Sequence, residues 1–213
     1  MAGNFWDELS GDDEHAAEYM LTYGEGPGSD TRLILGKHIG KDQSVLDVGC
    51  GPGWNMDHFA QYGPPLRTYK GVDYSERFVR VANERRKANL DVNFSTMNVL
   101  PFELQDCREL KEPDHSWDVV ILQDCLEHTN GYETPVKEAL RVARRRVVVT
   151  FWHLTENDDH INDDGNDGWG AWYSRPKWER FLKTLGYAWT HETTPEGANR
   201  HHDYYVVYKE RHE

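Results

Sequence analysis

One stretch, residues 45–54, constrains the fold of this chain more than any other. It is a short apolar run, interrupted only by Asp47, that ends in a turn containing three glycines. Glycine adopts positive φ at little cost and lets a ligand approach the backbone closely. Residues 55–62 then read as a helix that is stopped by Gly63-Pro64-Pro65. A strand, a glycine-rich turn and a helix in this order predict the opening of a nucleotide-binding βαβ unit.

A second acidic position follows at the spacing that such a unit requires. Asp73 ends the next apolar run, in the segment Gly71-Val72-Asp73-Tyr74-Ser75. A carboxylate about twenty residues beyond the glycines accepts hydrogen bonds from ribose hydroxyls. We therefore expect Asp73 to hold the ribose of a nucleoside cofactor.

The residues of the turn favour one kind of cofactor over another. A dinucleotide site carries G-x-G-x-x-G, but Trp54 stands where the third glycine would be. Asp47 is unfavourable beside a pyrophosphate and favourable beside the ammonium group of a methionine moiety. No Lys or Arg lies between Gln43 and Leu66 to receive a phosphate.

The D-x-G-x-G-x-G stretch resembles motif I of the class I S-adenosylmethionine-dependent methyltransferases, and residues 71–75 resemble their acidic second motif. The resemblance implies an α/β, Rossmann-like doubly wound fold: a mostly parallel seven-stranded sheet, an antiparallel last strand and helices on both faces. It also implies S-adenosyl-L-methionine as cofactor. Relatives often carry Asp at position 98, where the Asn98 amide oxygen can still accept from the adenine amino group. The expected cofactor-binding residues are Asp47, Gly49, Cys50, Gly51, Gly53, Asp73, Tyr74, Asn98, Val99 and Gln123.

The rest of the chain reads as alternating helices and strands. Helices are expected at residues 30–38, 76–89, 135–142 and 175–185, and strands at 92–97, 117–122, 147–151, 187–191 and 204–208. The loop at 192–203 is too short for an ordinary crossover helix, so strand 204–208 should run antiparallel to strand 187–191. The arginines at 144–146 are expected in a solvated turn before the fifth strand.

Candidate catalytic residues follow the fourth strand. Residues 123–128, Gln-Asp-Cys-Leu-Glu-His, resemble a family turn that often ends in Leu-x-His. A hydroxyl nucleophile needs a base, and an ammonium must first lose its proton. The candidates are His128, Asp124 and His153, with His128 placed best by the resemblance; a histidine that only packs near the cofactor is an open alternative. His191, His201 and His202 are expected at the surface of the terminal hairpin.

Two segments combine acids with aromatic side chains. Residues 1–30 contain many acids and neither Lys nor Arg, and both a lid and a solvated arm remain open. Residues 152–173 do not fit a calcium loop; a metal site at His153 and His160 stays an alternative, although no metal is expected. We expect an arm and first helix at 1–40, and a methyltransferase domain at 41–213 with an acidic aromatic insertion at 152–173. The expected substrate-binding residues are Tyr19, Tyr23, Trp152, Trp169, Trp172 and Tyr173.

Composition limits the partners. The net charge of −13 disfavours a nucleic-acid partner, and the fourth-strand turn lacks the Asn/Asp-Pro-Pro-aromatic motif of nucleic-acid amino-methylating enzymes. Three cysteines without a disulfide pattern, no secretory signal and no long apolar run predict a cytoplasmic protein with no membrane partner. The predicted function is methyl transfer to a small-molecule O- or N-nucleophile. The alternatives are an S-adenosylmethionine-binding protein that does not methylate and, less favoured, an NAD(P)-dependent oxidoreductase; the oligomeric state stays open.

Overall fold

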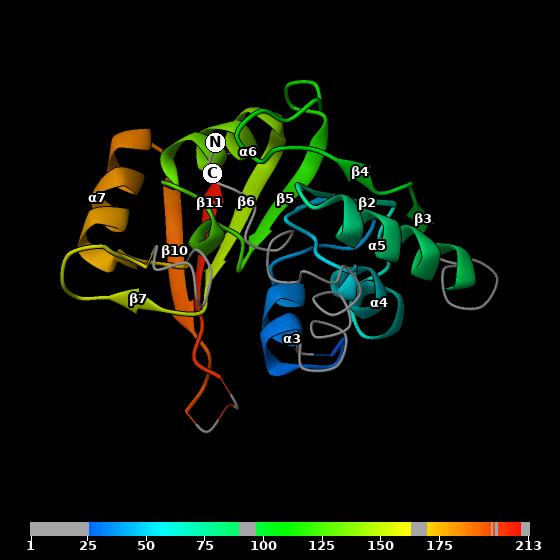
Figure 1. Cartoon of the computed structure of the whole chain (residues 1–213), viewed down its shortest axis with the longest axis horizontal. Coiled ribbons are helices and arrows are strands. Elements are labelled where there is room, and N and C mark those ends of the chain that lie inside the picture. Colours follow the sequence, from blue (N-terminus) through cyan, green and yellow to red (C-terminus); the bar gives the residue numbers. More distant parts are fainter. Residues whose placement is uncertain (1–25, 90–96, 163–169, 197, 199, 210–213) are drawn as a thin grey trace.

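A computed structural model describes residues 26–89, 97–162, 170–196, 198 and 200–209. Its centre is a sheet in the order β10-β11-β6-β5-β1-β2-β3 (Figure 1). The strands of this path are β1 (Ser44–Val48), β2 (Thr68–Asp73), β3 (Asn98–Val99), β5 (Trp117–Gln123), β6 (Ala143–Phe151), β10 (Ala188–Thr193) and β11 (Asp203–Tyr208). A further short strand, β4 (Glu103–Leu104), pairs with the end of β2. The predicted seven-stranded path is confirmed, with β4 added beside it.

The strand directions also agree with the prediction. The pairs β1–β2, β1–β5, β5–β6 and β2–β3 are parallel, whereas β11 is antiparallel to both β6 and β10. Every residue of β1 and β5 is buried. Central parallel strands are covered on both faces, so they read as nearly continuous apolar runs in the sequence.

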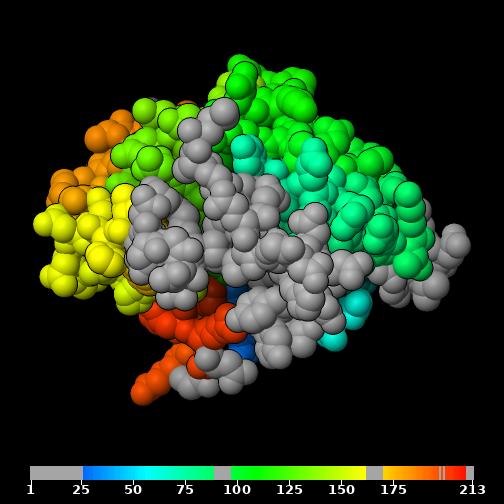
Figure 2. All heavy atoms as spheres, viewed as in Figure 1, coloured from blue at the N-terminus to red at the C-terminus, as the bar shows by residue number. Residues whose placement is uncertain are grey.

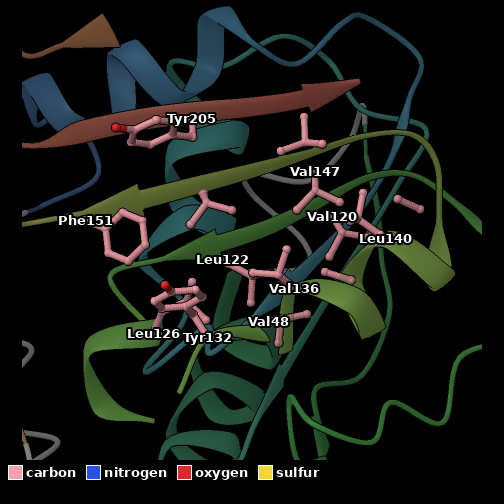
Figure 3. Close-up of a cluster of buried hydrophobic side chains, with 14 of the residues drawn as sticks. Val48, Val120, Leu122, Leu126, Tyr132, Val136, Leu140, Val147, Phe151 and Tyr205 are labelled. Atoms are coloured by element: carbon pink, nitrogen blue, oxygen red, sulfur yellow. The ribbon is translucent and has the colours of Figure 1, made fainter. Parts of the chain in front are cut away.

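Helices cover both faces of the sheet, as the doubly wound fold requires (Figure 1). The core of one face joins alternate strand residues to α6 (Glu133–Val142) and α7 (Arg175–Leu185), and Figure 3 shows it around Leu122, Val136 and Phe151. The core of the other face contains apolar side chains of three helices. These are α3 (Asp30–Lys37), α4 (Trp54–Gln61) and α5 (Glu76–Asn89).

Local sequence signals set several helix ends. The Ser29 hydroxyl accepts a hydrogen bond from the Arg32 backbone N–H and caps α3, and the Ser174 hydroxyl caps α7 through Lys177 N–H. Gly186, at φ 73°, ends α7 in the left-handed conformation that favours glycine. The predicted bounds of the helices at 76–89 and 175–185 are confirmed.

Two expectations about strands need correction. The arginines at 144–146 do not form a turn before the fifth strand but lie within β6. Arg144 and Arg145 reach the nearly buried Asp118 carboxylate, at 3.0 and 3.5 Å, so a counter-charge inside the sheet accommodates them. Residues 92–96 of the predicted strand 92–97 lie outside the described residues.

The second correction concerns the late acidic segment, residues 152–173, in which no strands were predicted. Its described residues form a small sheet in the order β7 (Leu154–Thr155), β9 (Gly170–Ser174), β8 (His160–Asn162). In the space-filling view, residues around 154–162 (yellow) lie at one side of the molecule and α5 (cyan-green) at the other (Figure 2). Within the described residues, no helix combines the length and the apolar character needed to cross a bilayer.

Candidate functional site

The glycine-rich turn lies where the strand order changes direction. β1 has β2 on one side and β5 on the other, and the turn follows the carboxyl end of β1. Ligands of open α/β sheets bind outside the carboxyl ends of the strands at such a point. The backbone N–H groups of Gly49 and Cys50 both donate to Val72 O, at 2.8 and 3.1 Å, and tie the turn to β2.

Two glycines of the turn are required for different reasons. A Cβ placed on Gly49, at φ 73°, would lie 2.6 Å from Cys125 Sγ, so this position allows the turn after β5 to pack closely. Gly51 also has positive φ, 52°, but a Cβ there would meet no described atom within 4 Å. Gly51 therefore borders a space at the edge of the sheet that no described residue fills, and Gly53 precedes α4.

The Asp73 carboxylate lies at the end of β2 and faces this turn. Its Oδ2 accepts a hydrogen bond from Gly51 N–H at 2.8 Å, and its Oδ1 accepts from Ser75 N–H at 2.9 Å. These contacts orient both oxygens beside the open space at Gly51. The Tyr74 side chain, next in the chain, is exposed.

Asp47 lies beneath the turn with a side chain that is almost fully buried. Its Oδ2 accepts hydrogen bonds from Tyr69 Oη and Asn55 Nδ2, whereas Oδ1 has no hydrogen-bond partner among the described residues. Burial raises the pKa of the Asp47 carboxyl to about 6, against the opposing effect of those two hydrogen bonds.

A second buried acceptor lies on the neighbouring strand. Gln123 ends β5, and its Oε1 is also buried with no partner among the described residues. Buried polar atoms in folded proteins normally find a partner. Two such acceptors, Asp47 Oδ1 and Gln123 Oε1, lie near the carboxyl ends of adjacent strands beside the glycine turn, and this arrangement fits the ammonium of a methionine moiety.

The adenine side of the expected site needs correction. Asn98 and Val99 form β3 and pair with Thr68 and Tyr69, at the amino end of β2, so they do not join Asp73. Because the chain then runs along β2, β4 pairs with Val72 and Asp73 instead, and Gln105 N–H donates to Asp73 O at 3.0 Å.

Asp106, an acid that was not among the residues predicted from the sequence, follows β4. Its carboxylate accepts hydrogen bonds from the Arg108 guanidinium and from Arg108 N–H, and those contacts lower the pKa of the Asp106 carboxyl. The sequence does show this acid: Asp106 lies in the segment between Asp73 and the buried strand β5.

Asp124 begins the turn after β5 and belongs to a hydrogen-bonded group. Its Oδ1 accepts from the Thr150 hydroxyl at 2.6 Å, and its Oδ2 lies 3.2 Å from His202 Nε2. His202 was expected at the surface but is 2% exposed. The correction has a topological cause: β11 lies between β6 and β10, so the residue before it enters the sheet edge rather than the solvent.

The other two catalytic candidates lie close to this edge. The His128 ring belongs to the 3₁₀ turn η1 (Leu126–His128), and its centroid lies 6.1 Å from that of the Trp152 ring. His153 is exposed. Glu127, next to His128 in the chain, is fully buried, and its Oε1 accepts a hydrogen bond from Trp152 N–H at 2.8 Å. Burial, reinforced by the charge of Asp124, raises the pKa of the Glu127 carboxyl well above its usual range.

The expected substrate residues are only partly brought together. Trp152 is 42% exposed and lies beside η1, whereas Trp172 lies on β9 with its ring 5.4 Å from that of His160. Tyr173 was expected to bind substrate, but its side chain is buried: the residue is 3% exposed, and its hydroxyl donates to Thr129 O at 2.6 Å. Its ring packs edge-on against Tyr132, so it belongs to the core. Tyr19, Tyr23 and Trp169 lie outside the described residues.

The described part of the chain holds no group of three or more His, Cys, Asp or Glu side chains arranged for a metal ion. The looser alternative at His153 and His160 receives no support from the contacts of His160, which packs against Trp172.

Comparisons with known proteins agree with this geometry. Residues 46–151, about half of the chain, match the family model described as a methyltransferase domain. The chain is 32% identical over 117 residues to norajmaline N-methyltransferase of Rauvolfia serpentina, covering 53% of this chain and 37% of that protein. It is 35% identical over 101 residues to 27-O-demethylrifamycin SV methyltransferase of Amycolatopsis mediterranei, covering 47% and 34%. The chain thus spans less than half the length of these relatives.

Solved structures show the same fold at low identity. A Burkholderia thailandensis 1,6-didemethyltoxoflavin-N1-methyltransferase with bound S-adenosylhomocysteine matches at a TM-score of 0.65 and 17% identity, covering 90% of this chain and 81% of that chain. A Haemonchus contortus phosphoethanolamine N-methyltransferase matches at a TM-score of 0.72 and 15% identity, covering 98% and 60%. With the strand order, the glycine turn and the family model in agreement, the chain belongs to the class I S-adenosylmethionine-dependent methyltransferase family.

Proposed function

We propose that the protein is an S-adenosylmethionine-dependent methyltransferase that acts on a small-molecule O- or N-nucleophile. The observation that carries the proposal is the set of hydrogen-bond acceptors around the glycine turn. Asp73 lies at the end of β2, and the buried atoms Asp47 Oδ1 and Gln123 Oε1 lie near the carboxyl ends of β1 and β5. Acceptors in these places suit the hydroxyls of a ribose and the ammonium of a methionine moiety.

Each part of the cofactor would meet different residues. Asp73 would accept from the ribose hydroxyls, and the open space at Gly51 would let the ligand pass close to the backbone. Asp106 would accept from the adenine amino group, a role that we move from Asn98 because β4, not β3, lies beside Asp73. Bound here, S-adenosylmethionine supplies an activated methyl group. The chain would hold the nucleophile in line with it and exclude water.

The proposed type of substrate is inferred from the net charge of the chain and from the side chains at the carboxyl end of β5. A net charge of −13 does not favour a phosphate backbone as partner. Trp152 and His128 offer aromatic faces beside the end of β5, and His128 is a candidate to orient the nucleophile. The names of the relatives include both N- and O-methyltransferases acting on small molecules, which supports a small-molecule acceptor without choosing the nucleophile.

Equilibrium binding separates this proposal from an oxidoreductase. We expect calorimetry to detect binding of S-adenosylmethionine and S-adenosylhomocysteine, and no binding of NAD⁺, because Asp47 and Trp54 disfavour a pyrophosphate. Binding of NAD⁺ alone would overturn the proposal.

Measurement of turnover distinguishes a methyltransferase from a protein that binds the cofactor without methylating. We expect S-adenosylhomocysteine to accumulate when S-adenosylmethionine and a library of small amines and hydroxylated compounds are supplied together. Tight binding with no product over the whole library would favour a regulatory role.

A further inference from the structure

Four residues from four separate segments meet at the carboxyl end of β5. The Asp124 carboxylate accepts a hydrogen bond from Thr150 on β6 and lies 3.2 Å from His202 Nε2, just before β11. His202 Nδ1 in turn lies 3.5 Å from Thr31 Oγ1 on α3. One carboxylate therefore connects the edge of the sheet, the terminal hairpin and the first described helix.

The two ends of this group differ in exposure. The His202 side chain is 3% exposed and the Asp124 side chain 33%, so the imidazole lies behind a carboxylate that remains reachable. Asp124 also has φ 49°, which is uncommon for a residue other than glycine. Its N–H donates to Thr150 Oγ1 at 3.1 Å, and this bond helps to hold the conformation. Backbone conformations of this kind persist where the surroundings enforce them, often at functional sites.

The surroundings keep Asp124 ionised. Burial acts to raise the pKa of this carboxyl, but hydrogen bonds from His202 and Thr150 and the charges of His202 and Arg32 outweigh it, and the pKa is lowered. The other acid in the turn that follows β5, Glu127, has a raised pKa. Asp124 is therefore the carboxylate that carries the charge at the end of β5.

A carboxylate with a lowered pKa serves some nucleophiles better than others. In N-methylation the amine first gives up its proton to solvent, and the nitrogen lone pair then forms the new N–C bond while the C–S bond breaks. The C–S electron pair stays on sulfur, and the positive charge passes from sulfur to nitrogen. A carboxylate beside that nitrogen stabilises the charge as it develops. Deprotonating an alcohol would instead need a base of high pKa, and the pKa of Asp124 is shifted the other way.

We propose that Asp124 faces the acceptor nitrogen of an amine substrate, and that His202 is the positioning residue that holds the Asp124 carboxylate toward it. This inference rests on the proposed methyltransferase function and names the substrate class of the same site. The exposed Trp152 ring, beside η1, supplies an aromatic face that attracts a cation at the same edge of the sheet.

A pair of cofactor analogues tests the inference without turnover. In both, a tertiary nitrogen replaces the sulfur of S-adenosylhomocysteine; one carries a 2-aminoethyl arm and its twin a 2-hydroxyethyl arm. Calorimetry at pH 7.5 should show that the amine-armed analogue binds the wild-type protein about tenfold more tightly, or better, than its twin. In Asp124→Asn the two analogues should bind within about threefold of each other.

Variants of His202 test the positioning role. His202→Leu should lose most of the preference for the amine arm, and His202→Gln, which keeps a hydrogen-bond donor, should retain most of it. His201→Leu is the matched control, because the neighbouring His201 is exposed, and it should leave the preference intact. Affinity for S-adenosylhomocysteine and the thermal unfolding midpoint, measured for each variant, separate a positioning effect from a loss of fold.

The possible results are distinct. Equal binding of the two analogues to the wild type, or a preference that survives in Asp124→Asn, overturns the amine assignment. A preference lost in Asp124→Asn but kept in His202→Leu overturns the role of His202 alone. Failure of S-adenosylhomocysteine and both analogues to bind the wild-type protein would instead refute the proposed methyltransferase function, on which this inference rests.

Discussion

Asp73 shows how a single side chain organises the proposed cofactor site. Its two carboxylate oxygens accept backbone hydrogen bonds from the glycine turn and from the residue that opens the next helix. Asp73→Ala would remove the proposed acceptor of the ribose hydroxyls. We expect S-adenosylmethionine affinity to fall by about 1–3 kcal/mol, measured by calorimetry.

The matched control for this variant is Asp114→Ala. Asp114 is an exposed acid that pairs with Arg141, remote from the glycine turn. Unchanged affinity in Asp73→Ala, or an equal loss in Asp114→Ala, would show that the site is misplaced.

Two glycines of the turn allow a comparison of one substitution that should mainly lower stability with one that should mainly weaken cofactor binding. Gly49→Ala should destabilise the fold more than Gly51→Ala. Both positions carry positive φ, at a cost of about 1–2 kcal/mol, but only at position 49 does the new Cβ meet Cys125 Sγ and Cβ. Gly51→Ala should instead weaken cofactor binding more, because its Cβ enters open space beside Asp73.

Chemical unfolding and calorimetry measure these two effects separately. Equal losses of stability in the two variants would contradict the close contact at Gly49. Cofactor affinity preserved in Gly51→Ala would place the ligand elsewhere along the edge.

At the scale of elements, Asp118 on β5 links β1, β6 and the residue before β2 at the amino edge of the sheet. Its carboxylate accepts from Ser44 N–H and Ser44 Oγ at the start of β1, and it pairs with Arg67, Arg144 and Arg145. Burial opposes its ionisation, but those hydrogen bonds and charges lower the pKa of the Asp118 carboxyl. Because three arginines pair with this one carboxylate, we infer that the cluster links strands and does not bind an external anion.

Asp118→Ala should therefore reduce the free energy of unfolding by about 1–3 kcal/mol at pH 7, less than a fully buried pair because the arginines are partly exposed. A depressed folded-state pKa contributes stability above the unfolded value, near 4, that is lost as the pH falls through the folded value. The difference between wild type and variant should shrink below pH 4 in urea titrations. Glu192→Ala, at an exposed pair with His38, is the control and should change stability by less than about 0.5 kcal/mol at pH 7; equal effects of the two variants would refute the link.

At the scale of the whole molecule, residues 1–40 and 152–173 remain proposed covers of the substrate side. Two contacts place the ends of these segments near the site. Trp152 N–H donates to Glu127 in the turn after β5, and Thr31 approaches His202. We expect hydrogen exchange to show added protection at residues 15–25 and 152–173 when cofactor and an accepted substrate are both present. The measurement compares the free protein, the cofactor complex and the ternary complex.

Truncation completes this test. Removal of the residues before Thr31 should lower turnover while S-adenosylhomocysteine affinity stays within a few-fold of the full chain. Full activity after truncation, with no gain of protection in either segment, would rule out the lid.

The order of helices and strands and the cofactor turn could be predicted from the sequence because local signals encode them, whereas the parallel sheet was expected from the resemblance to a known family. The apolar runs of β1 and β5, the D-x-G-x-G-x-G spacing and the helix at 76–89 each depend on residues close together in the chain. The same holds for the antiparallel last strand, since the short loop before it leaves no room for a crossover.

Only the tertiary structure decided which distant residues meet at the site. The choice of Asp106 over Asn98 beside Asp73 depended on which short strand pairs with the carboxyl end of β2. The burial of His202 beside Asp124, 78 residues away, depended on β11 inserting between β6 and β10. Strand pairing and sheet order are long-range properties that no local pattern specifies, and for that reason the glycine turn could be read from the chain while the contact between Asp124 and His202 could not.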